Sequence, residues 1–122
     1  MSGRNYPERD LQRAVVQILR ATVPEQFWHA SNTEVRGGRV GGAIAASRGS
    51  TRGWPDIMVV NPRTFVATAI ELKSKRGTLS DEQKDMQQVW RDRYWIVRDI
   101  ETALLAIKCA GWDVTKAKGA QQ

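Results

Sequence analysis

The chain has 122 residues, which is enough for one domain with a hydrophobic core and too few for two. Its 19 Lys and Arg against 13 Asp and Glu give a net charge of +6, which favours polyanionic partners but does not indicate a fold. A single cysteine excludes an internal disulfide and a cysteine-rich zinc site, and no apolar run approaches the roughly 20 residues of a membrane span.

Helical periodicity opens the chain. Residues 7–20, PERDLQRAVVQILR, space their apolar side chains as an amphipathic helix does, and Pro24 lies beyond its end. The segment FWHA at residues 27–30 is a candidate short strand. Residues 34–53 then carry six glycines and four arginines, which leaves too little periodic apolar surface for regular structure. We expect a mobile basic loop there.

A strand hairpin follows the loop. Residues 54–75, WPDIMVVNPRTFVATAIELKSK, contain two apolar stretches joined by NPRT, a sequence typical of a turn. The next segment, LSDEQKDMQQVWRDR, predicts a helix because Ser80 and Gln83 have the spacing of a capping box.

The C-terminal part predicts a strand and a helix. YWIV at residues 94–97 is the strand, and DIETALLAIKCAG is the helix, with Asp99 at its N-cap and Gly111 just past its end. Trp90, Trp95 and Trp112 sit in patterns that indicate core positions, and we expect residues 113–122 to form a frayed tail. The order of elements predicts one α/β domain over residues 1–122, with helices packed on a mixed sheet.

Three charged side chains stand out in the apolar hairpin. Strand alternation places Glu71 and Lys73 on one face, and a turn centred between Arg63 and Thr64 places Asp56 opposite Glu71. The two carboxylates would then have Cβ atoms roughly 4.5–5.5 Å apart, which destabilises a sheet unless a cation lies between them. Two carboxylates with waters and a substrate phosphate suit Mg²⁺, and Lys73 could then hold a water or neutralise developing charge. A plain cross-strand ion-pair ladder explains the same spacing.

These residues also carry a resemblance to a nuclease family. The PD of GWPDIMVV and the ELK of AIELKSKRGTLSDEQ resemble the PD-(D/E)XK nucleases, and within them the VRR-NUC domain. PERDLQRAVVQIL is similar to the opening helix of that domain, so the resemblance covers about Glu8 to Ile107. It implies a restriction-endonuclease-like core and phosphodiester hydrolysis that depends on Mg²⁺ or Mn²⁺. It further implies a homodimer that cuts branched DNA such as Holliday junctions. The single cysteine and the lack of a signal peptide or membrane span lead us to expect a cytoplasmic protein, in the host cell if the chain is phage-encoded.

The resemblance also assigns roles to single residues. It makes Asp56 and Glu71 metal ligands and Lys73 the catalytic lysine. Glu8 becomes an accessory acid and further metal ligand, and Gln83 an active-site residue of its helix. Without the resemblance, Glu8 is explained as a first-turn acid favoured by the helix dipole, and Gln83 as the capping partner of a serine.

DNA contacts are predicted around the basic loop. The candidate residues are Arg36, Arg39, Arg48 and Arg52 in the loop, Trp54 beside it, and Lys75 and Arg76 after the second hairpin strand. Arginines among glycines can follow a phosphate backbone and position DNA without reading its sequence. A solvated loop without DNA contacts remains the alternative. The arginine-rich loop and Trp54 depart from the family pattern and leave the preferred substrate open. The DNA could be flaps, ends or single strands instead of junctions. A further alternative is a module that binds DNA without catalysis.

Overall fold

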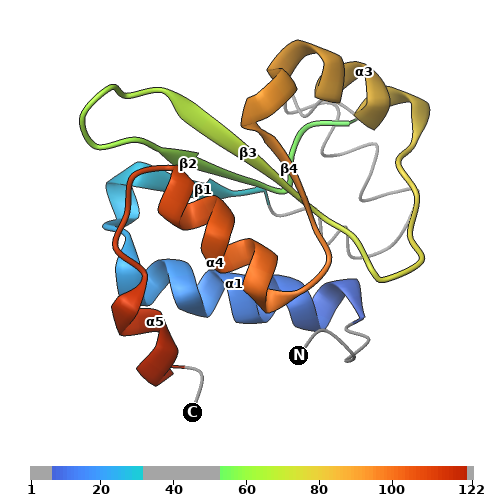
Figure 1. The fold of residues 1–122 in the computed structure, drawn as a ribbon. Helices are drawn as coiled ribbons and strands as arrows, with labels where there is room; N and C mark the ends of the chain where they lie inside the picture. Colours follow the sequence, from blue (N-terminus) through green and yellow to red (C-terminus); the bar gives the residue numbers. More distant parts are fainter. Residues whose placement is uncertain (1–6, 32–52, 121–122) are drawn as a thin grey trace.

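The computed structural model describes residues 7–31 and 53–120, and Figure 1 shows them as a sheet with helices packed on it. Within these residues the predicted α/β architecture, a mixed sheet flanked by helices, is confirmed. It is consistent with the restriction-endonuclease-like core that the resemblance implies. The predicted basic loop lies outside the described residues, except for Gly53.

The helices and strands follow the predicted order, and η1, η2 and α5 are additions to it. Their bounds are α1 Glu8–Thr22, the 3-10 turn η1 Glu25–Phe27, β1 Trp28–Ala30, β2 Ile57–Val60, β3 Ala67–Leu72, α3 Asp81–Trp90, the 3-10 turn η2 Arg91–Arg93, β4 Tyr94–Val97, α4 Ile100–Cys109 and α5 Thr115–Ala120. In the part of the chain that the structure describes, no helix has the length and apolar character needed to cross a membrane.

The sheet has the strand order β1-β2-β3-β4 in the described part of the chain. β1 and β2 are antiparallel, as are β2 and β3, whereas β4 runs parallel to β3. The hairpin has the predicted register, since Val60 pairs with Ala67 and Ile57 pairs with Ile70. The connection from β3 to the parallel strand β4 contains α3, as a parallel pair requires a long crossover.

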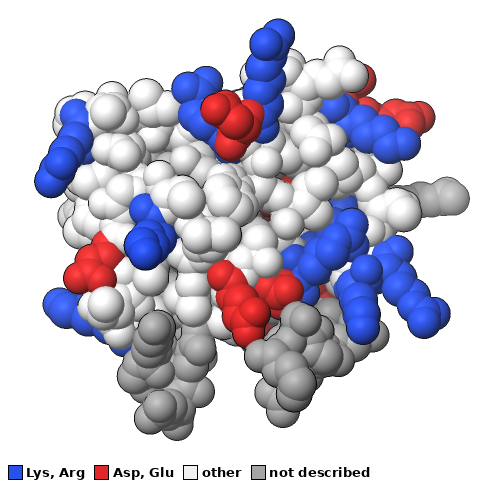
Figure 2. All heavy atoms as spheres, viewed as in Figure 1, with Lys and Arg blue, Asp and Glu red and all other residues white. Residues whose placement is uncertain are grey.

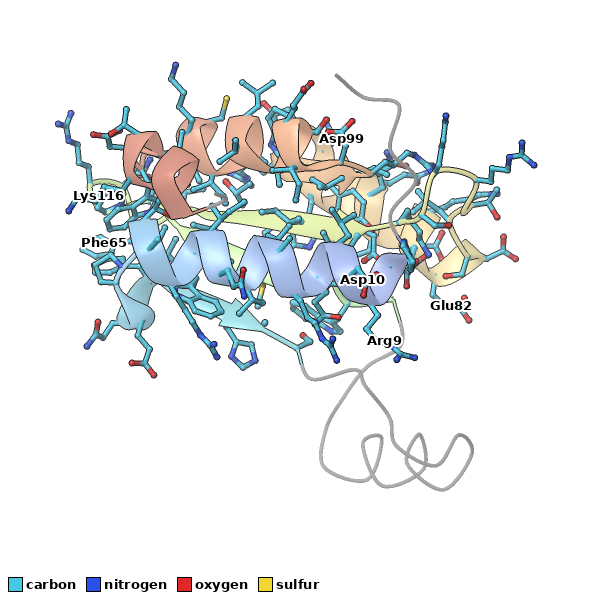
Figure 3. The ribbon with its side chains drawn as sticks, turned by 90° about the horizontal axis from the view of Figure 1, so that it is seen from below. Arg9, Asp10, Phe65, Glu82, Asp99 and Lys116 are labelled. Carbon is cyan, nitrogen blue, oxygen red and sulfur yellow. The ribbon has the colours of Figure 1, made fainter. Side chains whose placement is uncertain are left out.

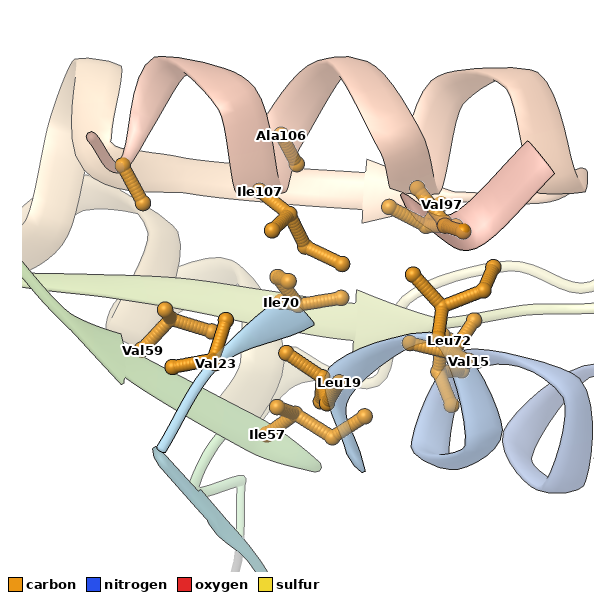
Figure 4. Close-up of a cluster of buried hydrophobic side chains, with 14 of the residues drawn as sticks. Val15, Leu19, Val23, Ile57, Val59, Ile70, Leu72, Val97, Ala106 and Ile107 are labelled. Carbon is orange, nitrogen blue, oxygen red and sulfur yellow. The ribbon is translucent and has the colours of Figure 1, made fainter. Parts of the chain in front are cut away.

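The hydrophobic core lies between one face of the sheet and the pair of helices α1 and α4. Figure 4 shows side chains from both layers meeting there, including Leu19 of α1, Ile57 of β2, Ile70 of β3 and Ile107 of α4. All four are fully buried or nearly so. Figure 1 shows α3 apart from α1 and α4, and α3 contributes no fully buried side chain. The position of α3 must therefore depend on other contacts.

The predicted ends of α4 are confirmed. The side chain of Asp99 accepts a hydrogen bond from the backbone N–H of Thr102 at 2.7 Å, which caps the N-terminus. Gly111 follows the helix with a φ of +105°, a backbone conformation that residues other than glycine rarely adopt. A Cβ on Gly111 would also lie 2.7 Å from Nδ2 of Asn61, so the hairpin turn packs directly against this glycine.

Two expectations about the C-terminal part are wrong. The tail is not frayed throughout, because Thr115–Ala120 forms α5, which packs against α1 with the side chain of Ala117 fully buried. Trp90 is not a core residue, because α3 lies away from the core and leaves this ring only partly buried. Trp95 and Trp112 do pack against the core as expected.

Candidate active site

The two hairpin carboxylates face each other at the end of the sheet remote from the hairpin turn. Asp56 immediately precedes β2 and Glu71 lies near the end of β3. The last paired residues are Ile57 and Ile70, so Asp56 falls opposite Glu71 one step further along the register. The structure therefore places these two residues opposite each other, as the hairpin register predicted.

Backbone hydrogen bonds hold Asp56 in place. Its Oδ2 atom accepts a hydrogen bond from the backbone N–H of Leu72 at 2.8 Å. Its carbonyl oxygen accepts another from the backbone N–H of Ser31 at 2.7 Å, beyond the end of β1. The carboxylate is thus fixed from the side of β3, and the backbone that carries it is fixed from the side of β1.

Glu71 is 2 % exposed and is held by only one of its two oxygens. Oε2 accepts a hydrogen bond from Nε2 of Gln83 at 2.8 Å and lies 4.0 Å from Nζ of Lys73. Oε1 is buried and has no hydrogen-bond partner. A buried carboxylate oxygen without a partner is costly, so Oε1 is an open position for a cation or a donor.

Gln83 joins the first turn of α3 to this carboxylate. Its Oε1 accepts a hydrogen bond from the backbone N–H of Ser80 at 2.9 Å, and its own backbone N–H donates to Oγ of Ser80 at 3.2 Å. The predicted capping box is therefore confirmed. Its Nε2 atom remains free to donate to Glu71, so the capping contact and the contact with the carboxylate coexist in one side chain.

The electrostatic environment disfavours two negative charges. Burial, together with the charges of Asp56 and Glu8, raises the pKa of Glu71 to about 9. Burial also raises the pKa of Asp56, although the hydrogen bond from Leu72 and the charge of Lys73 oppose this shift. Lys73 alone does not compensate the pair. A bound cation would allow both carboxylates to ionise.

The carboxylate pair fits the coordination chemistry of Mg²⁺ or Mn²⁺. Among residues 7–31 and 53–120, no group of three or more His, Cys, Asp or Glu could hold a metal ion by itself. Magnesium commonly takes only one or two protein carboxylates and keeps waters in its remaining positions. The open Oε1 of Glu71 and the raised pKa values of both acids agree with such a site.

Glu8 lies at the exposed start of α1 and is close enough for its charge to raise the pKa of Glu71. Figure 3 shows the next two residues, Arg9 and Asp10, at the same end of the molecule as Glu82 of α3. Glu8 does not complete a three-ligand cluster with Asp56 and Glu71. Its role as an accessory acid or metal ligand stays a prediction.

Two residues beside the site were missed by sequence reasoning. The hydroxyl of Tyr94 is buried beside Glu71 without a hydrogen bond of good geometry, and burial, the charges of Glu71 and Asp56 and the contact with Glu71 raise its pKa. Tyr94 reaches them because it pairs with Ala69 in the parallel strand, two positions before Glu71. In sequence it is simply one residue of the apolar segment YWIV, which gives no signal of this role.

Arg98 is the second missed residue, and it fixes the loop that follows Lys73. Its Nη1 atom donates to the carbonyl oxygens of Ser74 and Gly77, each at 2.7 Å. The loop between them carries the exposed predicted DNA contacts Lys75 and Arg76. Figure 2 shows Lys and Arg side chains gathered at this end of the molecule, beside a smaller acidic patch.

Trp54 lies two residues before Asp56 and is 44 % exposed. Its ring meets that of Trp90 edge to face, with centroids 6.5 Å apart. Gly53 packs even more closely, because a Cβ there would lie 2.8 Å from atoms of Glu82. These contacts hold α3 against the segment that leads into β2. The four predicted loop arginines, Arg36, Arg39, Arg48 and Arg52, lie outside the described residues.

A cavity of about 840 Å³ lies elsewhere, between α1 and the edge strand β1. Gln12, Arg20 and Trp28 are among its lining residues, and neither carboxylate of the hairpin is. The candidate active site is therefore a partly covered sheet end and not this cavity.

Comparison with known proteins bears on the same residues. The sequence matches the family model described as the VRR-NUC domain over residues 3–102. Neither a curated protein nor a solved structure gives a match. The matched span includes both carboxylates, Lys73 and Gln83.

The raised pKa of Glu71 predicts how the metal-free protein responds to pH. A carboxyl group whose pKa is higher in the folded than in the unfolded state stabilises the fold at low pH and loses that contribution as pH rises. In excess chelator, the melting temperature should therefore fall as the pH rises from about 4.5 to about 9. Glu71→Gln should flatten this fall, as measured by thermal unfolding at a series of pH values.

The matched control is Glu82→Gln, which makes the same change at an exposed position of α3. It should leave the pH dependence of the wild type intact. Identical pH profiles for Glu71→Gln and the wild type would show that Glu71 has an ordinary pKa.

Proposed function

The chain belongs to the VRR-NUC family of nucleases, and we propose that it is a metal-dependent, structure-selective endonuclease acting on branched DNA such as Holliday junctions. One observation carries the proposed metal-dependent cleavage, and the choice of branched DNA rests on the family resemblance. Asp56 and Glu71 are held opposite each other, with one buried oxygen of Glu71 unpartnered and Lys73 at 4.0 Å from the other. A protein that only bound DNA would have no use for two opposed acids, one of them buried, because such a pair destabilises the sheet.

Asp56 and Glu71 are the proposed ligands of Mg²⁺ or Mn²⁺, with Glu8 as an accessory acid. When bound, such an ion supplies Lewis acidity at the phosphate and a water with a lowered pKa. The protein contributes rigidity. The N–H of Leu72 orients Asp56, and the amide of Gln83 holds one oxygen of Glu71 so that the other remains available.

Lys73 is the proposed catalytic lysine. Its side chain is 14 % exposed, so its ammonium group lies in a partly desolvated position beside Glu71. A positive charge in such a position stabilises negative charge that develops on a phosphate more strongly than one in bulk water does. Lys73 would therefore stabilise the transition state or hold the attacking water.

The surface around the site supports DNA as the substrate. Lys75 and Arg76 are exposed on the loop that Arg98 fixes, and Trp54 presents a partly exposed ring beside Asp56. The net charge of +6 favours a polyanion. The arginines of residues 34–53 are proposed as further phosphate contacts.

The proposed site of action is the cytoplasm, which is that of the host cell if the chain is phage-encoded. Flaps, ends or single strands are the alternative substrates.

Metal dependence is the first test of this function. A panel of four-way junctions, flaps, linear duplexes and single strands should be cut in Mg²⁺ or Mn²⁺ and left intact in excess chelator. Ca²⁺ should support binding with little cleavage, because its looser coordination positions a water poorly. Gel analysis of the products gives both the metal requirement and the preferred structure. Full activity in chelator would rule out the metal site.

The role of Lys73 predicts a loss of rate without a loss of affinity. Lys73→Ala should lower cleavage by roughly 10²-fold or more, because the interaction is made in the transition state. DNA affinity measured in Ca²⁺ should change by only a few-fold. The matched control is Lys75→Ala on the exposed loop, which should weaken binding more than it slows cleavage at saturating protein. A parallel fall in affinity and rate for Lys73→Ala would make Lys73 a phosphate anchor.

We further propose a homodimer, because resolving a four-way junction requires two cuts related by an approximate two-fold axis and one domain offers one site. Closed two-fold dimers are the commonest assembly of identical chains. Light scattering should give twice the mass of 13.7 kDa, and a supercoiled cruciform should be cut in both strands within one binding event. A monomer that releases singly nicked product would exclude paired cutting and favour the flap or single-strand substrates.

A further inference from the structure

The turn between β2 and β3 presents an aromatic ring in an unusual way. Phe65 is 70 % exposed and has a φ of +58°, in the left-handed region that bulky side chains rarely occupy. Glycine or asparagine would be the ordinary residue here. A bulky apolar side chain that is both strained and exposed is a candidate for a function that the fold itself does not need.

Hydrogen bonds hold this turn rigidly. The backbone N–H of Phe65 donates to the carbonyl of Asn61 at 2.9 Å, and the N–H of Asn61 donates to the carbonyl of Val66 at 2.9 Å. Oδ1 of Asn61 also accepts from the backbone N–H groups of Arg63 and Thr64, at 2.8 and 3.1 Å. The ring of Phe65 is thus displayed from a fixed backbone.

Two further rings support Phe65 from behind. Phe27 stacks on it with centroids 6.4 Å apart and planes inclined by 19°. Trp112 meets Phe27 edge to face at 5.3 Å, and its Nε1–H donates to the carbonyl of Val60 at 3.0 Å. The inner side of Phe65 is therefore occupied, and the ring remains mostly open to solvent. Figure 3 shows Phe65 at the end of the molecule opposite Asp10 and Glu82.

The size of this surface decides between a protein and a nucleobase as its partner. Among the large exposed apolar side chains of the described residues, only Phe65 and Val66 belong to this turn. The core of a protein interface is a cluster of several apolar and aromatic side chains, and this turn offers two. One open ring instead matches one base, and Arg63 in the same turn is exposed and can meet the adjacent phosphate.

We propose that Phe65 is a stacking site for an unpaired nucleobase of the DNA substrate, separate from the carboxylates that carry the chemistry. The proposal rests on the proposed DNA substrate and adds to it a preference for strands with unstacked bases. Six residues of extended chain separate Phe65 from Glu71, a span of at most about 20 Å. On a direct path between the two sites, about six nucleotides at 3.4 Å each would span this distance.

Equilibrium binding in chelator tests the site without cleavage. The probes are oligothymidylate of about 16 nucleotides, within the range of single-strand sites, and a blunt duplex whose bases are all paired. Phe65→Ala should weaken binding of the single strand by roughly 5- to 150-fold, the usual effect of removing one stacking ring, and leave duplex binding unchanged. Phe65→Trp should retain single-strand binding, because the indole offers a larger face. Val89→Ala, which removes an exposed apolar side chain of α3, should change neither.

Phe65→Asn separates this role from a folding defect. Asparagine tolerates positive φ, so this variant should melt at the same or a higher temperature while losing single-strand binding to the same extent as Phe65→Ala. Unchanged single-strand affinity in both variants would overturn the stacking site. A change in molecular mass by light scattering on mutating Phe65, with single-strand affinity retained, would overturn it in favour of a contact between copies.

The outcome is independent of whether the protein cleaves DNA. A wild type that cuts DNA while the Phe65 variants bind single strands normally leaves the nuclease function standing and removes the stacking site. A wild type that does not cut DNA but binds single strands through Phe65 removes the nuclease function and leaves the stacking site standing.

Discussion

The site depends on one constraint: the half-buried Asp56, just before β2, lies opposite the buried Glu71 of β3. Such a pair is unfavourable by itself, because burial and mutual repulsion both oppose ionisation. The surrounding contacts hold the acids in place without neutralising them: a backbone N–H for Asp56, an amide for Glu71, and one lysine at the limit of ion-pair distance. The core on the other face of the sheet provides the rigidity that keeps the two acids together.

The position of α3 follows from the site more than from the core. This helix buries no side chain completely, yet Gln83 connects it to β3. Its Glu82 and Trp90 also contact Gly53 and Trp54, in the segment that leads into β2. The helix that connects the parallel strands β3 and β4 is therefore held in place by its hydrogen bond to the carboxylate of Glu71. Changes at Glu71 should be transmitted to this helix more readily than to α1 or α4.

Local spacing predicted the hairpin, its register and the capping box, because turn residues and strand alternation fix which side chains meet. It could not reveal Tyr94, because the position of a parallel strand depends on a long crossover and not on adjacent residues. It also missed α5, since the burial of Ala117 against α1 stabilises a segment with little apolar periodicity. The positive φ of Phe65 likewise arises from the hydrogen-bonded turn, against the preference of the residue.

Position 83 shows how an active site can restrict a choice that helix formation leaves open. A capping box accepts glutamate and glutamine alike at this position, because only a side-chain oxygen is needed to receive the N–H of Ser80. Glutamate here would place a third carboxyl group beside Asp56 and Glu71 and would remove the donor that now fixes Glu71. The two residues are thus interchangeable for α3 but not for the chemistry beside it. Among sequences of this kind, glutamine at the capping position would accompany a buried acid on the neighbouring strand.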